Sequence, residues 1–204
     1  MLRNARPMHA LWLPMLALAV VGFTAAGAAQ TASSTPASLQ PPIRLTALAV
    51  RTVDASVATP VTITLERWST DAEVDSWINN MREATPKKMI DTLRSFPSIG
   101  RLGSTGSVGV DLRFARAEGV QNSGRQHITL AADRAMSFWE TSTSPRSTEY
   151  PFMLIDIQLD AKGEGNGKVI AAAKLMMDQV SKTLIVENYE DQPVLLQTVK
   201  LTKR

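Results

Sequence analysis

The sequence predicts a mainly antiparallel β domain with two helices inserted between strands. Apolar and polar residues alternate with a period of two along most of the chain, and short polar or Gly-rich breaks separate these runs. A helical period occurs only between residues 69 and 97. We count about nine strands, and the pattern allows either a β-sandwich or a partly closed barrel.

The first 29 residues have the pattern of a secretory signal peptide. Arg3 and Arg6 precede an apolar stretch at 11–23, and the small residues at 26–29 offer a cleavage site. The apolar stretch is shorter than the ~20 residues of a spanning helix, so we expect no stable membrane anchor after cleavage. Residues 30–42, rich in Ser, Thr, Ala and Pro, predict a flexible linker, and 43–204 a single β-rich domain. We therefore expect a secreted or periplasmic protein.

The composition argues against several classes of function. Removing Arg3 and Arg6 from the 22 Lys and Arg leaves 20 basic residues against 19 acidic ones, so no strong field attracts nucleic acid. The chain has no cysteine, which excludes disulfides, thiolate catalysis and cysteine-ligated metals. We expect no cofactor and no metal site.

The first strands and the helices follow from local patterns. Residues 43–53 and 61–66 alternate as strands, and 54–60 predicts the turn between them. Thr70-Asp71-Ala72-Glu73 fits a capping box at a helix start. The second helix begins with Pro86 in its first turn. The apolar faces of the two helices are predicted to comprise Val74, Trp77, Ile78 and Met81, and then Met89, Ile90, Leu93 and Phe96.

The rest of the chain predicts strands joined by loops. The strands are expected at 108–115, 125–130, 136–140, 151–160, 168–177, 183–186 and 194–201, with loops at 117–124 and 141–148 and a Gly-rich turn at 161–167. Residues 168–177 have a helix-forming composition, and either structure fits them. The preceding Gly-Asn-Gly and the turn-like 178–181 favour a strand paired with 151–160.

One predicted hairpin brings polar side chains together. Hydrophobic matching places Ile128 opposite Phe114 and Leu130 opposite Leu112. This register puts four polar residues on one face or close to it, which is our predicted ligand site: Asp111, Arg113, Arg125 and His127. Such a group could bind an anion, or it could be a solvated outer face with ordinary cross-strand pairs.

The catalytic alternatives have little support. A hydrolase would use His127 with Asp111, but the Ser-containing segment 103–107 lacks the spacing of a nucleophile elbow, and we predict no catalytic residues. Asp160 and Glu164 begin a segment like a calcium loop, which fails at its third and twelfth positions, Lys162 and Ala171. A hairpin turn explains that segment better.

Several segments together resemble a group of exported bacterial proteins that carry no assigned function: 61–75, 108–116, 128–140, 149–168 and 185–194. The resemblance covers most of the mature chain. It implies export and a single domain, and it supplies no catalytic residue, cofactor or substrate.

Taken together, these patterns predict an exported, non-enzymatic module that binds a small ligand or an envelope partner. Two alternatives are a hydrolase using His127 and Asp111, and a lipocalin-like carrier, which needs a barrel interior that can hold an apolar ligand.

Overall fold

The computed structural model of the chain describes residues 39–51, 54–83, 86–120, 123–134, 152–177, 184–188 and 192–203. The predicted signal peptide, the strand at 136–140 and the loop at 141–148 lie outside these ranges. Within them the chain forms two helices and ten strands, in the order β1 (Ile43–Arg51), β2 (Asp54–Leu65), α1 (Asp71–Glu83), α2 (Pro86–Ser95), β3 (Gly100–Ser104), β4 (Val110–Leu112), β5 (Phe114–Gly119), β6 (Gln126–Ala132), β7 (Phe152–Leu159), β8 (Glu164–Met177), β9 (Leu184–Asn188) and β10 (Val194–Lys203).

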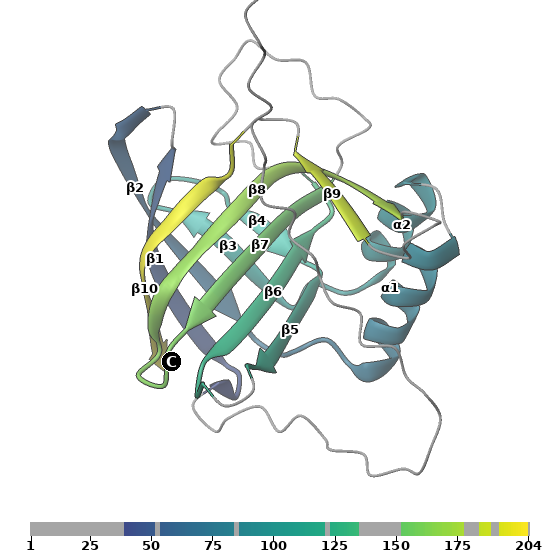
Figure 1. Cartoon of the computed structure of the whole chain (residues 1–204), viewed down its shortest axis with the longest axis horizontal. Helices are drawn as coiled ribbons and strands as arrows, with labels where there is room; N and C mark the ends of the chain where they lie inside the picture. The colour runs from purple at the N-terminus through teal and green to yellow at the C-terminus, as the bar shows by residue number, and fades with distance from the viewer. Residues whose placement is uncertain are drawn as a thin grey trace, which may run out of the picture.

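The strands form one antiparallel sheet that curls into a nearly closed barrel (Figure 1). The order is β4-β3-β2-β1-β10-β8-β7-β6-β5, and β9 pairs with β8 outside this path. The two ends of the path, β4 and β5, are separated in the chain only by Arg113, whose amide donates to the carbonyl of Ala131 at 2.9 Å. One run of chain therefore pairs first with β3 and then with β6. This shared strand makes the architecture a barrel rather than a sandwich.

Apolar side chains fill the interior of the barrel. Alternate side chains of each strand point inward. Ile63, Leu130 and Ile157 have at most 2% of their surface exposed, and Ala47 of the same core has 8%. If the interior held a cavity large enough for a ligand, the side chains that line this cavity would have solvent-accessible surface. The near-complete burial of most of these side chains gives no support to a lipocalin-like carrier.

The two helices begin as the sequence predicts. The Thr70 amide donates to Glu73 Oε2 at 2.8 Å, and the Glu73 amide donates to Thr70 Oγ1 at 3.3 Å, which completes the capping box. Pro86 is the first residue of α2, where its missing N–H costs nothing. Ile78 was predicted to be buried, but 39% of its surface is exposed because α1 packs through the narrower face that carries Val74 and Trp77.

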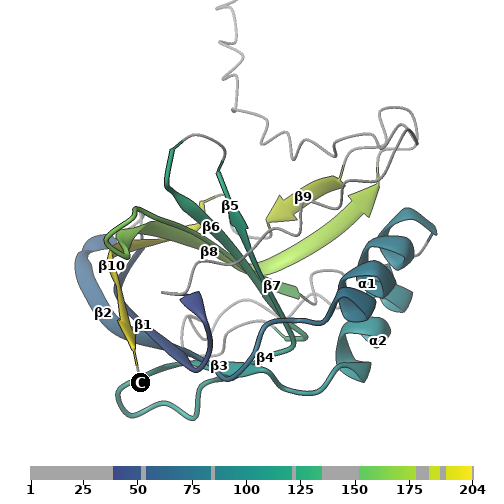
Figure 2. The same cartoon turned by 90° about the horizontal axis from the view of Figure 1, so that it is seen from below.

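A second apolar core lies between the helices and the outside of the barrel. Figure 2 shows α1 and α2 together on one side of the barrel, next to β7 and the extended end of β8. The Trp77 ring lies 6.0 Å from the ring of Phe114 and 5.8 Å from that of Phe152, the second in an edge-to-face arrangement. Leu93 of α2 is fully buried in the same cluster. The helices thus cover one part of the outer face of the barrel.

Several predicted boundaries were wrong. Strand β2 begins at Asp54 rather than after a turn at 54–60, and Pro60 is tolerated because β3 pairs with β2 only from Val61 onward. Strand β3 was not predicted, and Val108, predicted within a strand, is 83% exposed in the turn between β3 and β4. Strand β5 runs to Gly119 into the predicted loop.

Two further segments are defined by the structure. Leu39, in the predicted linker, is buried in the barrel core, and its carbonyl accepts a hydrogen bond from Trp68 Nε1 at 3.0 Å, so the packed domain includes Leu39. Residues 168–177 form a strand within β8, as predicted, because they pair with β7, β9 and β10. The Gly-rich turn is shorter than predicted, since β8 already begins at Glu164.

Candidate functional site

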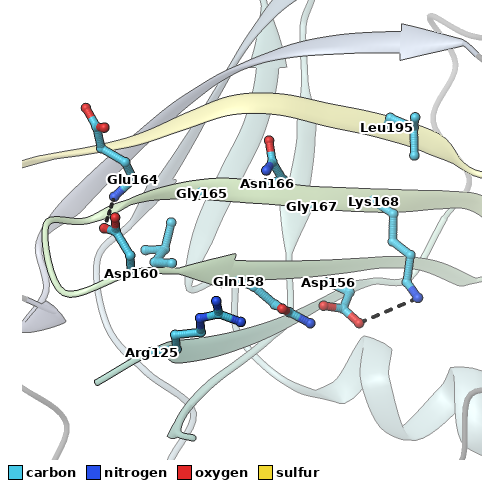
Figure 3. Close-up of a pocket in the computed structure, with 11 residues that line it drawn as sticks. Arg125, Asp156, Gln158, Asp160, Glu164, Gly165, Asn166, Gly167, Lys168 and Leu195 are labelled. Atoms are coloured by element: carbon cyan, nitrogen blue, oxygen red, sulfur yellow. Dashed lines mark hydrogen bonds and ion pairs between the residues drawn. The ribbon is translucent and has the colours of Figure 1, made fainter. Parts of the chain in front are cut away.

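A pocket of about 470 Å³ lies on the outer face of the barrel, away from the helices (Figure 3). The beginning of β6, the end of β7, the beginning of β8 and one residue of β10 form it. We call it the outer pocket, and its lining residues are Arg125, Asp156, Gln158, Leu159, Asp160, Glu164, Gly165, Asn166, Gly167, Lys168 and Leu195.

Strand alternation and register position the side chains of this pocket. Because Ile155, Ile157 and Leu159 point into the barrel, Asp156 and Gln158 between them point outward. In the β7–β8 pairing Gln158 lies directly opposite Asn166, and Asp156 lies opposite Lys168. Neighbouring strands therefore present a row of polar side chains on the outer face.

Local irregularities of the backbone shape the pocket. A Cβ atom at Gly167 would lie 2.5 Å from the carbonyl oxygen of Asp156, and one at Gly165 would overlap the carbonyl oxygen of Gln158. Only glycine allows β8 to approach β7 so closely as it bends. On the other side of β8, the pairing with β10 shifts between Leu196 and Val199, and Thr198 within this bulge has a φ of 50°.

Three charged side chains form a connected group beside the pocket. His127 Nε2 lies 3.0 Å from Asp156 Oδ1, and Lys168 Nζ lies 3.8 Å from Asp156 Oδ2. The hydrogen bond to Asp156 raises the pKa of His127 against the opposing effect of burial. Burial acts to raise the pKa of Asp156, but the hydrogen bond and charge of His127, together with Lys168, outweigh it and lower that pKa. The carboxylate of Asp156 is thus neutralised within the protein.

The other two carboxylates of the pocket also have partners. Asp160 Oδ1 accepts hydrogen bonds from the amides of Lys162 at 2.8 Å and Glu164 at 3.0 Å, of which the bond from Glu164 contributes most to a lowered pKa of Asp160. Gly163, with a φ of +80°, completes this hairpin turn. Glu164 Oε1 lies 3.3 Å from Lys200 Nζ. Asp160 therefore stabilises the hairpin. The described residues contain no group of three or more His, Cys, Asp or Glu placed to hold a metal ion.

Three polar side chains of the pocket have no partner among the described residues: Arg125, Gln158 and Asn166. Figure 3 shows Arg125, which directly precedes β6, beside Gln158 on β7, with Asn166 on β8. A guanidinium and two amides together offer several donors and two acceptors to a bound molecule.

The structure divides the predicted site residues into two groups. Arg125 lines the outer pocket, and His127 contacts it through Asp156. Asp111 lies elsewhere, with its Oδ1 3.8 Å from Arg101 Nε. Arg113 donates to the carbonyl of Phe96 at 3.0 Å, and its Nε lies 3.9 Å from Asp133 Oδ1.

The predicted register explains this error. Phe114 lies opposite Ala131, and Ile128 lies opposite Ala117, so the pairing is displaced from the one we expected. Phe114 faces the helices while Ile128 faces the barrel interior, and the two cannot share a face. His127 and Asp111 therefore do not form a pair. The carboxylate beside His127 is that of Asp156, which sequence reasoning missed.

Sequence reasoning also missed Gln158, Asn166 and Lys168. The period of two in 151–160 puts Asp156 and Gln158 on the same face of their strand, and this signal could have identified them. The turn predicted at 161–167 concealed Asn166, since a residue within a turn has no cross-strand partner. A shorter turn ending at Gly163 would have placed Asn166 opposite Gln158.

No helix in the described part of the chain has the length and apolar character needed to cross a membrane. Comparison with protein-family models, with curated proteins and with solved structures finds no match. The functional assignment therefore rests on the geometry and chemistry of the outer pocket.

Proposed function

We propose that this protein is an exported, non-enzymatic module that binds a small polar ligand in the outer pocket. One observation carries the proposal: Arg125, Gln158 and Asn166 meet in one pocket without partners, while the carboxylates around them are all engaged. Polar groups that the protein leaves unpaired in a recess are available to a ligand.

The pocket suits a molecule of modest size. Its volume of about 470 Å³ lies within the range of roughly 300–1,000 Å³ typical of small-molecule sites. The amides of Gln158 and Asn166 each donate and accept hydrogen bonds, so hydroxyl and amide groups are suitable partners. The paired charges beside them hold the strands in place and need not rearrange on binding.

Binding is a better explanation of this site than catalysis. The imidazole of His127 interacts with Asp156, and none of the described residues that line the pocket is a serine. Ser107, in the segment 103–107, donates to the carbonyl of Ser104 at 3.0 Å in the turn after β3. A hydrolase would require a nucleophile within hydrogen-bond reach of its base.

The export part of the proposal rests on the sequence. Arg3 and Arg6, the apolar stretch at 11–23 and the small residues at 26–29 have the order of a secretory signal. N-terminal sequencing of the product from the periplasm or the medium should give a chain that begins at Ala29 or Gln30. An intact N-terminus in the cytoplasmic fraction would contradict export and leave the binding proposal unaffected.

Ligand screening tests the binding proposal. Sugars, amino acids, organic acids and nucleosides would be screened against the purified mature protein by ligand-observed NMR. We expect at least one class to bind, and the double variant Gln158→Ala/Asn166→Ala to lose that binding. The control Asn79→Ala, an exposed amide on α1, should bind like the wild type. Binding that survives the double variant, or capture only by an envelope protein, would contradict a small-ligand site in this pocket.

A further inference from the structure

The outer pocket changes in character from one end to the other. The guanidinium of Arg125 lies at the β6 end, the amides of Gln158 and Asn166 lie in the middle, and Leu195 of β10 lies at the opposite end (Figure 3). On the basis of the proposed function, we infer that the ligand is an amphipathic organic acid. Its carboxylate binds Arg125, and its apolar end rests on Leu195.

The charges of the pocket identify the acid group. Asp156 is paired with His127 and Lys168, Glu164 is paired with Lys200, and Asp160 accepts hydrogen bonds from backbone amides. Among the described lining residues, Arg125 is the cation that no carboxylate neutralises. A guanidinium binds a carboxylate through two parallel hydrogen bonds, and such charge-assisted bonds are about twice as strong as neutral ones.

A carboxylate suits this position better than a phosphate. Asp160 and Glu164 also line the pocket, and their carboxylates repel a second negative charge even though each has a partner. One guanidinium compensates one unit of negative charge, which a carboxylate carries at neutral pH. A phosphate monoester carries nearly two.

The centre of the pocket requires polar groups in the ligand. Gln158 and Asn166 are directly opposite each other, both are exposed, and neither is bound to another described residue. An amide or hydroxyl group placed after the carboxylate can satisfy a donor on one side chain and an acceptor on the other.

The far end of the pocket is apolar. Leu195 is 37% exposed although it lies in the middle of the sheet, and it is paired with Lys168 on β8 and Val50 on β1. Leu48 on the same outer face of β1 is also 38% exposed. Gln126 pairs with Leu159, whereas Leu195 pairs with Lys168, so Arg125 and Leu195 are separated by three strand spacings of ~4.8 Å and by about four residues of ~3.3 Å along the strands. Their backbones therefore lie about 19 Å apart on the diagonal of the pocket. The side chain of Arg125 extends towards Gln158 and shortens the distance that a ligand must span (Figure 3). An apolar chain at this end removes exposed leucine surface from water.

A series of three acylated compounds tests this inference. N-hexanoylglycine carries a carboxylate, one amide and an apolar chain in the expected order. N-hexanoylglycinamide lacks the charge, and N-acetylglycine lacks the apolar chain. Isothermal titration with the mature protein should show that the first compound binds about tenfold more tightly than either of the others.

Two variants assign the effects to residues. Arg125→Gln should remove the preference for the acid over its amide and leave binding of the amide unchanged. Leu195→Ser should remove the preference for the hexanoyl over the acetyl compound and keep the preference for the acid. Arg44→Gln is the matched control, because Arg44 is an exposed arginine of the outer face on β1, outside the pocket. It should behave like the wild type.

The result can separate this inference from the proposed function. Equal affinities for the acid and the amide, an unchanged preference in Arg125→Gln, or no binding of N-hexanoylglycine at roughly 10 mM would overturn the inference. If a neutral ligand then binds and this binding is lost in Gln158→Ala/Asn166→Ala, the proposed function stands although the inference of an organic acid fails. If no screened ligand depends on those two residues, both fail.

Discussion

The interaction of His127 with Asp156 makes stability depend on pH in a defined direction. Their side chains meet at 3.0 Å, and the pKa of His127 is raised above its ordinary value chiefly by this hydrogen bond. A raised pKa means that the folded state binds the proton more tightly than the unfolded state. The stabilisation is therefore fully present below about pH 6.5, the unfolded pKa, and is lost as the pH rises through the folded pKa.

The structure limits the size of this effect. A hydrogen bond between charged groups contributes roughly 1.5–3 kcal/mol. Here 25% of the His127 side chain and 26% of the Asp156 side chain are exposed, so solvent screens the pair, and we expect about 1 kcal/mol. Two other charges face the imidazole: Glu118, opposite His127 on β5, raises the pKa, and Lys168 lowers it. Their effects oppose each other, so Asp156 dominates.

Two measurements check this prediction. His127 is the only histidine after residue 29, so its ring proton gives one titrating NMR signal, with a pKa expected above about 6.5. The free energy of unfolding in urea should exceed that of His127→Gln by about 1 kcal/mol near pH 5.5, and this difference should shrink towards pH 8.5. Asp156→Asn should lower the histidine pKa. A difference that is constant or that grows with pH would refute the reasoning.

Three further predictions concern stability, each measured by urea unfolding. Gly165→Ala should cost roughly 3 kcal/mol, because the added Cβ would overlap the backbone of β7. Gly119→Ala should cost less than about 1 kcal/mol, because its Cβ would lie 3.9 Å from the side-chain nitrogen of Gln126, which is an ordinary contact. Hydrogen bonds from Arg67 lower the pKa of Glu73 to about 2, so Glu73→Gln should reduce the free energy of unfolding by roughly 1–2 kcal/mol at pH 7. The difference in free energy of unfolding between wild type and variant should shrink between about pH 4.5 and 2, and a constant difference would contradict this cause. Thr198→Gly should stabilise the fold by about 1 kcal/mol, since a φ of 50° strains a β-branched residue; unchanged or lower stability would show that the bulge is not strained.

Local sequence patterns were enough to predict the elements that depend on neighbouring residues. The capping box at Thr70 and Glu73 and the alternation of β7 are encoded within a few positions, and both are confirmed. The sequence did not distinguish a barrel from a sandwich, because closure of the barrel depends on the chain around Arg113. There the chain stops pairing with β3 and begins to pair with β6. A local sequence pattern does not indicate which strands pair with the segments before and after such a residue.

The candidate site was only half predictable for the same reason. Matching hydrophobic residues across the hairpin assumed that Phe114 and Ile128 bury against one core, whereas the chain has two, one inside the barrel and one under the helices. Phe114 belongs to the second because Trp77, far away in sequence, packs against it. In the observed β5–β6 register Glu118, and not Asp111, lies opposite His127. The separate β6–β7 register pairs Thr129 with Asp156 and so places His127 beside that carboxylate. The burial of Phe114 under the helices thus goes with a β5–β6 register that separates His127 from Asp111, and the pairing of β6 with β7 supplies Asp156 as its partner.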